Sequence, residues 1–233
     1  DENLLTPKNS NFLVSIVPIS ESQFDIAGCD ISTGEIFVCQ TDNIIDDMVR
    51  VNPAEIIYPE KDAEKGIIKK LREIYKTTPV YEKLYLRSDI NLIVSHVFGG
   101  NIVSDAKDSV CATTLLAGYL FNTQRGSNVS FRAPYDLKSG RQLLIDSATW
   151  KSLEIDAPIN DGGACLLDVI DKTLTAAGAR KLRSYLRTLP GDIDVILSRQ
   201  KHIGHLLLNH SLMAEIGSVL SQIPDVNRAI SRL

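Results

Sequence analysis

The run NFLVSIV at residues 11–17, followed by FDIAGCDI at 24–31 and EIFVC at 35–39, decides the fold of the first half of this chain. Each run is short and rich in apolar and β-branched residues, and turn residues such as Pro18 and Gly34 separate the runs. Runs of this length and composition are typical of β-strands. The short connections between them predict an antiparallel meander.

Helix and strand signals alternate after the meander. Residues 44–51 have helical spacing, residues 55–58 form another short apolar run, and residues 63–75 place isoleucine and leucine on one helical stripe. A last edge strand is expected at 80–84. This interleaving predicts an α/β layer built on a mixed sheet.

The second half of the chain changes to helical spacing. We expect a helix at 109–123, a short strand at 143–145, and only helices after the glycine pair at 162–163. The sequence therefore predicts an α/β domain over residues 1–105 and an all-helical segment over 106–233.

Local signals place the ends of the later helices. Leu174, Leu182 and Leu189 belong to one apolar stripe of a predicted helix. Asp192 is a good N-cap for the next helix, and Ser211 is the expected cap of the one that follows.

Composition places the chain among ordinary globular proteins, with 44% hydrophobic and 23% charged residues. Its four cysteines lie far apart without a CxxC pair, which indicates reduced thiols and a cytoplasmic protein. No apolar run approaches the roughly 18 residues that a membrane span requires. The chain starts without Met and stops inside an amphipathic pattern, so we expect a piece of a longer protein.

Charge is distributed unequally along the chain. Residues 1–124 hold 11 basic and 18 acidic residues, whereas residues 125–233 hold 14 basic and 11 acidic residues. The acidic half argues against a nucleic-acid interface there. The mildly basic half permits one without requiring it.

The sequence lacks the usual signatures of a cofactor or metal site. A phosphate-binding loop would need GxxxxGK[ST], and the glycine pairs at 99–100 and 162–163 have neither the lysine nor the spacing. His202 and His205 lie three residues apart on a predicted helix, but no carboxylate or cysteine stands at zinc-ligand spacing. We therefore expect no catalytic, cofactor-binding or metal-ligating residue in this segment.

Asp30 is the one residue that invites an enzymatic interpretation. With Asp25 and Glu35 nearby in sequence, it could belong to a metal-dependent nuclease. Such catalysis needs several carboxylates converging from different elements. We prefer the hypothesis that Asp30 anchors the turn at 32–34.

The only basic cluster that resembles a nucleic-acid footprint lies on the predicted helix before Leu189. Arg180, Arg183 and Arg187 follow i, i+3, i+7 spacing and share one helix face. They could contact nucleic acid or a neighbouring domain. The favoured interpretation is a solvated face, or ion pairing with Asp168, Asp171 and a neighbouring domain.

Several motifs together resemble one family, the bacterial DNA mismatch-repair protein MutS. The motifs occur in the family's order, and the longest is LLDVIDKTLTAAGARKLRSYL at 166–186. The others are DISTGE at 30–35, PAEIIYP at 53–59, ATTLLAGYLFNTQ at 112–124, Asp146 with Thr149, Leu153 and Glu154, and PDVNR at 224–228.

The resemblance implies a connector domain of RNase-H-like fold followed by the first part of the helical core, or lever, domain. It also implies a parent protein that binds mismatched DNA as a homodimer, hydrolyses ATP with Mg²⁺ and recruits MutL. The mismatch reader and the ATPase would lie outside residues 1–233, so this segment would link them mechanically. A nuclease using Asp30 and a stand-alone DNA-binding module are the alternatives.

Overall fold

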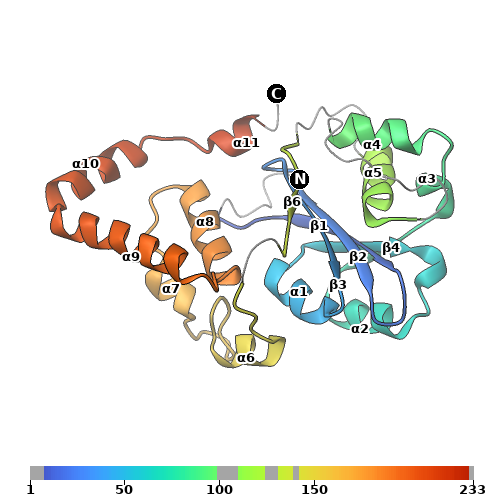
Figure 1. Ribbon diagram of the computed structural model, residues 1–233, viewed down its shortest axis with the longest axis horizontal. Coiled ribbons are helices and arrows are strands. Elements are labelled where there is room, and N and C mark those ends of the chain that lie inside the picture. Colours follow the sequence, from blue (N-terminus) through green and yellow to red (C-terminus); the bar gives the residue numbers. More distant parts are fainter. Residues whose placement is uncertain (1–7, 99–109, 124–130, 139–141, 231–233) are drawn as a thin grey trace. The chain divides into compact units, whose positions relative to one another are not determined.

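The computed structural model describes residues 8–98, 110–123, 131–138 and 142–230. The chain divides into two compact units, which Figure 1 shows as ribbons. We call Ser10–Leu137 with Asn227–Leu233 the sheet unit, and Asp1–Asn9 with Lys138–Val226 the helical unit.

The sheet unit is built on one six-stranded sheet. Its strands, in the spatial order β5-β4-β1-β2-β3-β6, are β5 (Thr77–Val80), β4 (Glu55–Pro59), β1 (Phe12–Pro18), β2 (Phe24–Asp30), β3 (Glu35–Thr41) and β6 (Tyr135–Asp136). Strands β1, β2 and β3 pair antiparallel, with Ile16 opposite Ile26 and Ile26 opposite Cys39. Strands β4, β5 and β6 are parallel to their neighbours, so the predicted meander and mixed sheet are confirmed.

Helices cover both faces of this sheet. The helices of the unit are α1 (Ile44–Val51), the 3₁₀ turn η2 (Glu60–Asp62), α2 (Gly66–Ile74), α3 (Glu82–Tyr85), α4 (Ile90–Phe98) and α5 (Ala112–Thr123). Residues Met48 of α1 and Leu71 of α2 pack with Val14 on one face. Phe98 of α4 and Leu115 of α5 belong to the cluster on the other face.

Burial on both faces explains why the strand sequences are almost continuously apolar. Strand β1 buries five consecutive residues from Leu13 to Val17. In a strand, successive side chains point to opposite faces, so a run without alternation predicts a sheet covered on both sides. The central strands therefore supply both hydrophobic clusters at once.

Helix α5 is fastened to the sheet by polar contacts as well as apolar ones. The carboxylate of Asp25 accepts the Ala112 N–H at 2.8 Å, and the buried Ser15 hydroxyl contacts the Ala112 carbonyl at 2.7 Å. Gly118 brings the helix against the α3 segment, because a Cβ there would lie 2.2 Å from the Leu84 carbonyl oxygen. The expected boundary at residues 105 and 106 therefore does not separate the compact units, since α5 belongs to the sheet unit.

In its described residues, the helical unit contains helices and no sheet. They are α6 (Ser147–Ser152), α7 (Leu166–Ile170), α8 (Ala176–Arg187), α9 (Ile193–Leu208) and α10 (His210–Leu220), and α11 (Val226–Ile230) starts at the last residue of the unit. Asp192 caps α9 as predicted, and its carboxylate accepts the Asp194 N–H at 2.9 Å. The prediction of helices only after the 162–163 pair is confirmed within the described residues.

Some predicted boundaries are wrong. Residues 143–145 form no strand, because the only strand-type pairing of this stretch is an isolated bridge from Gln142 to Pro190 within the described residues. Strand β5 ends at Val80, and residues 82–85 are helical. Leu174 precedes α8, whose N-cap is Thr175, and α10 starts at His210 before the proposed cap Ser211.

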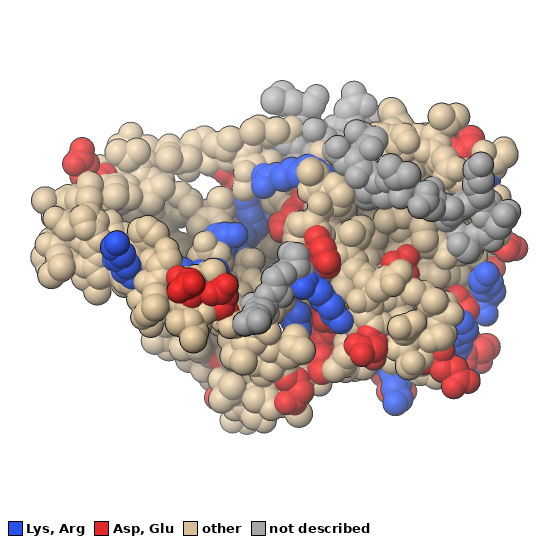
Figure 2. Space-filling model, viewed as in Figure 1, with Lys and Arg blue, Asp and Glu red and all other residues tan. Residues whose placement is uncertain are grey.

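Charges of both signs lie next to one another on the face of the molecule shown in Figure 2. A surface of interspersed charge is typical of a solvent-facing protein. Among the described ranges, no helix combines the length and the hydropathy that a membrane crossing requires.

Substituting Gly118 by Ala tests the close approach of α5. The added methyl group would collide with backbone atoms of Leu84, which cannot move aside as a side chain end would. We expect Gly118→Ala to lower the free energy of unfolding by about 1–3 kcal/mol in urea denaturation. Gly66→Ala is the control, because a Cβ there meets nothing within 4 Å; equal destabilisation by both changes would contradict the packing at Gly118.

Candidate functional site

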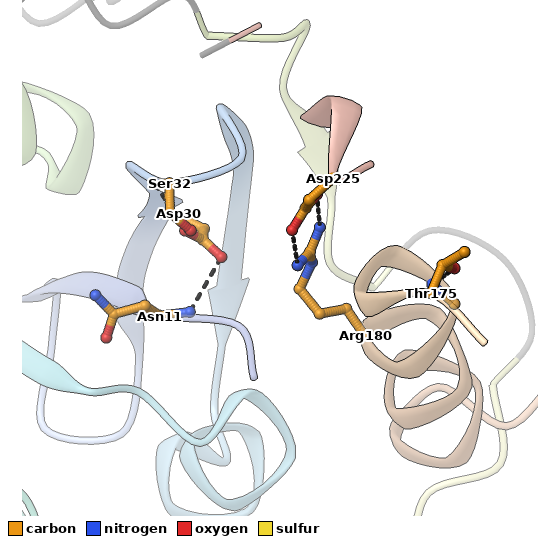
Figure 3. A network of polar contacts seen from close by, with 7 residues as sticks. Asn11, Asp30, Ser32, Thr175, Arg180 and Asp225 are labelled. Carbon is orange, nitrogen blue, oxygen red and sulfur yellow. Dashed lines mark hydrogen bonds and ion pairs between the residues drawn. The ribbon is translucent and has the colours of Figure 1, made fainter. Parts of the chain in front are cut away.

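Asp30 lies at the end of β2 and is completely buried. Its carboxylate accepts the Asn11 N–H at 3.0 Å, and the Ser32 N–H and hydroxyl at 2.9 and 2.6 Å (Figure 3). Its own carbonyl accepts the N–H groups of Thr33 and Gly34, and Gly34 takes a φ of 70°. The hypothesis that Asp30 anchors the turn is therefore confirmed.

The three carboxylates considered for a nuclease do not converge. Asp25 contacts the N-terminus of α5, and Glu35 accepts the hydroxyl of Tyr135 at 3.0 Å. Asp25 and Asp30 are five residues apart on one strand, so they point to opposite faces of the sheet. No group of three or more His, Cys, Asp or Glu suited to a metal ion occurs among the residues that the structure describes.

The cysteines, the histidine pair and the described glycine pair show no sign of a metal or phosphate site. Cys29, Cys39, Cys111 and Cys165 are free thiols, and burial raises the pKa of Cys29 far above its ordinary value. His202 and His205 are both exposed on α9. The glycine pair at 162–163 forms a turn in which Gly162 has a φ of 81°. The pair at 99–100 lies outside the described residues.

Arg180 of α8 forms a bidentate ion pair with Asp225. Both guanidinium contacts measure 2.7 Å, and the Arg180 side chain is only 7% exposed (Figure 3). Planar, two-point pairing of this kind is the strongest form of arginine–carboxylate contact. It joins α8 to a residue 45 positions later in the chain.

Arg187 pairs with Asp156 at the other end of α8. Its Nε donates to the Asp156 carboxylate at 3.0 Å, and a second guanidinium nitrogen contacts the same oxygen. The other oxygen of Asp156 accepts the indole N–H of Trp150 at 2.8 Å. The largely buried Asp156 carboxylate therefore connects α6 to α8.

The proposed partners Asp168 and Asp171 have other roles. Asp168 accepts the backbone N–H and the thiol of Cys165, and these hydrogen bonds lower the pKa of Asp168. Asp171 accepts the N–H and hydroxyl of Thr173 and pairs with Lys8. Arg183 also helps to lower the pKa of Asp168 by its charge, but its Nε is buried without a hydrogen-bond partner in the described part of the chain.

An aromatic residue missed by the sequence interpretation lies within the basic cluster. The Lys181 ammonium lies 4.8 Å and the Arg199 guanidinium 4.0 Å from the centre of the Tyr185 ring. Lys181 and Tyr185 are four residues apart on α8, which is the spacing that could have revealed this contact. Arg180, Arg187, Lys181 and Arg199 thus all contact other side chains of the helical unit.

A cleft of about 320 Å³ opens in the sheet unit beside the end of α5. It is lined by Asn11, Phe12, Leu13, Ile31, Ala54, Glu55, Lys76, Tyr119, Leu120 and Thr123. Within it, the Glu55 carboxylate accepts Lys76 at 2.9 Å and the Thr78 hydroxyl at 2.6 Å. Burial opposes ionisation of Glu55, but these contacts outweigh it and lower its pKa. The main charges of the cleft therefore neutralise each other.

Comparison with known proteins gives one consistent result. A family model described as MutS domain II matches residues 11–132, and one described as MutS domain III matches residues 148–233. Two similar proteins are both called DNA mismatch repair protein MutS. The one from Dinoroseobacter shibae is 28% identical over 100% of this chain and 27% of its own length, and the one from Wolbachia pipientis wMel is 29% identical over 100% and 28%. The chain thus spans little more than a quarter of these relatives.

The contact between Asp25 and α5 predicts a pH dependence of stability. Burial raises the pKa of Asp25 above its ordinary value of 3.8, and the Ala112 N–H only partly opposes this. The native state then holds this proton more tightly than the unfolded chain, so the contribution of Asp25 to stability falls as the pH rises from the ordinary pKa through the raised one.

Asp25→Asn cannot ionise, yet its side-chain oxygen can still accept the Ala112 N–H. We expect its stability relative to the unsubstituted chain to improve as the pH rises from about 4 to about 7, measured by urea unfolding. Asp161→Asn, at an exposed position of the helical unit, is the control. A difference that stays constant with pH would contradict the role of Asp25 as a half-buried, ionisable group.

Proposed function

Because the chain belongs to the MutS family of DNA mismatch-repair proteins, we propose that it forms the mechanical link between the catalytic and DNA-reading parts of a longer protein. In this role the sheet unit is the connector, and the helical unit is the first part of the lever. The segment itself performs no chemistry. Its task is to transmit a change of conformation, which requires units that move without deforming.

The bracing of α8 is the observation that carries this proposal. Arg180 and Arg187 lie on one face of the helix and form ion pairs with Asp225 and Asp156. Removing one partner of a buried pair leaves an uncompensated charge, so such pairs resist local rearrangement. Arginines engaged in this way support a structural helix better than a phosphate-binding surface.

Membership of the MutS family also suggests a function for the full-length protein. We propose that the full-length protein is a cytoplasmic homodimer that binds mismatched DNA, hydrolyses ATP with Mg²⁺ and recruits MutL. The printed name of the relatives, DNA mismatch repair protein, supports the DNA-repair part of this proposal. We also propose that the connector has an RNase-H-like sheet, which the antiparallel β1-β2-β3 meander with parallel β4 and β5 supports.

Replacing Arg180, Arg183 and Arg187 by Gln in the full-length protein tests the bracing role. We expect the thermal midpoint of unfolding to fall, because Asp225 and Asp156 lose partners worth roughly 3 kcal/mol per buried pair. At temperatures where the variant stays folded, we expect binding to mismatched DNA without nucleotide to persist. ATP-induced release from that DNA should be slower, because the lever is less rigid.

Lys201→Gln is the matched control, since it removes positive charge at an exposed position of α9. It should leave stability, binding and release unchanged. If the triple substitution abolishes DNA binding without lowering stability, the arginines contact DNA and the bracing role is wrong. Unchanged ATP-induced release in a destabilised variant would contradict the mechanical role.

An assay with Mn²⁺ and DNA tests the two alternative functions on the 233-residue chain. We expect no cleavage, and no difference between the chain and Asp30→Asn, because the Asp30 carboxylate is buried and already accepts three hydrogen bonds. Cleavage that Asp30→Asn abolishes would establish the nuclease. Salt-sensitive DNA binding by the chain alone would instead establish a DNA-binding module.

A further inference from the structure

The segment formed by α9 and α10, residues 193–220, has little apolar contact with the rest of the helical unit. Neither helix buries a single residue, although both are rich in leucine, isoleucine and valine. Ile193 is 70% exposed and Leu208 is 86% exposed. Regions with few buried apolar side chains open locally at low free energy. We call residues 193–220 the arm.

Specific contacts attach the arm to α8 and the residues before it. At the start of the arm, the Arg199 guanidinium lies over the ring of Tyr185 on α8. Within α10, Gly217 lies next to the Leu174 side chain, because a Cβ there would be 3.4 Å from a Leu174 methyl group. After the arm, Asp225 returns the chain to Arg180 of α8.

The contact after the arm differs from the other two in strength and position. Arg180 is 7% exposed and Asp225 21% exposed, so the pair is largely removed from water and screened less than a surface pair. The two side chains close a loop of the chain that contains the whole arm. A contact that closes such a loop limits how far its two ends can separate.

We propose that Arg180 and Asp225 form an ionic clasp that determines whether the arm is held against α8 or released. With the pair formed, the arm is fixed at both ends. With the pair broken, the arm loses its tie to α8 at Asp225 but keeps its contacts at Arg199 and Gly217, and it opens as one unit while α8 stays helical. This inference concerns residues of this chain only and does not rest on the proposed function.

Hydrogen–deuterium exchange of the whole 233-residue chain tests the clasp. We expect Asp225→Asn to accelerate exchange of the α9 and α10 amides by roughly tenfold to a hundredfold, the effect of losing a charged hydrogen-bonded pair. Amides of α8 and of the sheet unit should keep their rates.

A second variant covers the case in which Asp225→Asn fails to fold because Arg180 stays charged and unpaired. Arg180→Gln with Asp225→Asn removes both charges and should open the arm without leaving a buried charge. Arg187→Gln with Asp156→Asn is the matched control, because it neutralises the other buried pair of α8 and should leave arm exchange unchanged. Unaltered arm exchange in the first double variant, or equal acceleration of the arm by the control, would overturn the clasp.

Discussion

The sheet unit depends on a sheet that is buried on both faces. Its central strands must then supply apolar side chains to two hydrophobic clusters at once, which β1 does with five consecutive buried residues. A polar group on such a strand has to be satisfied by nearby protein atoms, because water does not reach it. The buried Ser15 and Asp30 are satisfied in this way, by α5 and by Asn11 with the turn after β2. The half-buried Asp25 likewise accepts the Ala112 N–H. Burial of the sheet on both faces therefore explains why these polar side chains have structural roles.

The regular parts of the fold were predictable because their signals are local. The runs at 11–17, 24–31 and 35–39 contain their own strand pattern and turn residues, and they form the meander. The apolar run at 143–145 has the same composition but no neighbouring strand beyond one bridge, so composition alone was misleading there. The grouping of α5 with the sheet unit is hidden from the sequence for a similar reason. The apolar sequence of α5 predicts a buried helix, but it does not indicate which surface the helix packs against.

The arginine cluster shows the same limit at the level of side chains. Helical spacing correctly placed Arg180, Arg183 and Arg187 on α8 and favoured ion pairing over an open binding face. From the sequence, Asp168 and Asp171 were the expected partners, and both lie close to the arginines in the chain. The structure pairs Arg180 with Asp225 and Arg187 with Asp156, which lie 45 and 31 positions away. Tertiary partners at such separations leave no periodic trace, so only the structure could identify them.

The position of α5 in the chain has a consequence for synthesis on the ribosome. Five of the six strands precede residue 81, but the helix that seals one sheet face ends at Thr123. Until α5 has left the ribosomal exit tunnel, side chains such as Leu13, Cys29 and Ile57 lack part of their cover. A nascent sheet with exposed apolar surface is prone to aggregation and is a natural client of chaperones. The order of elements along the chain therefore delays completion of the first domain well beyond its last central strand.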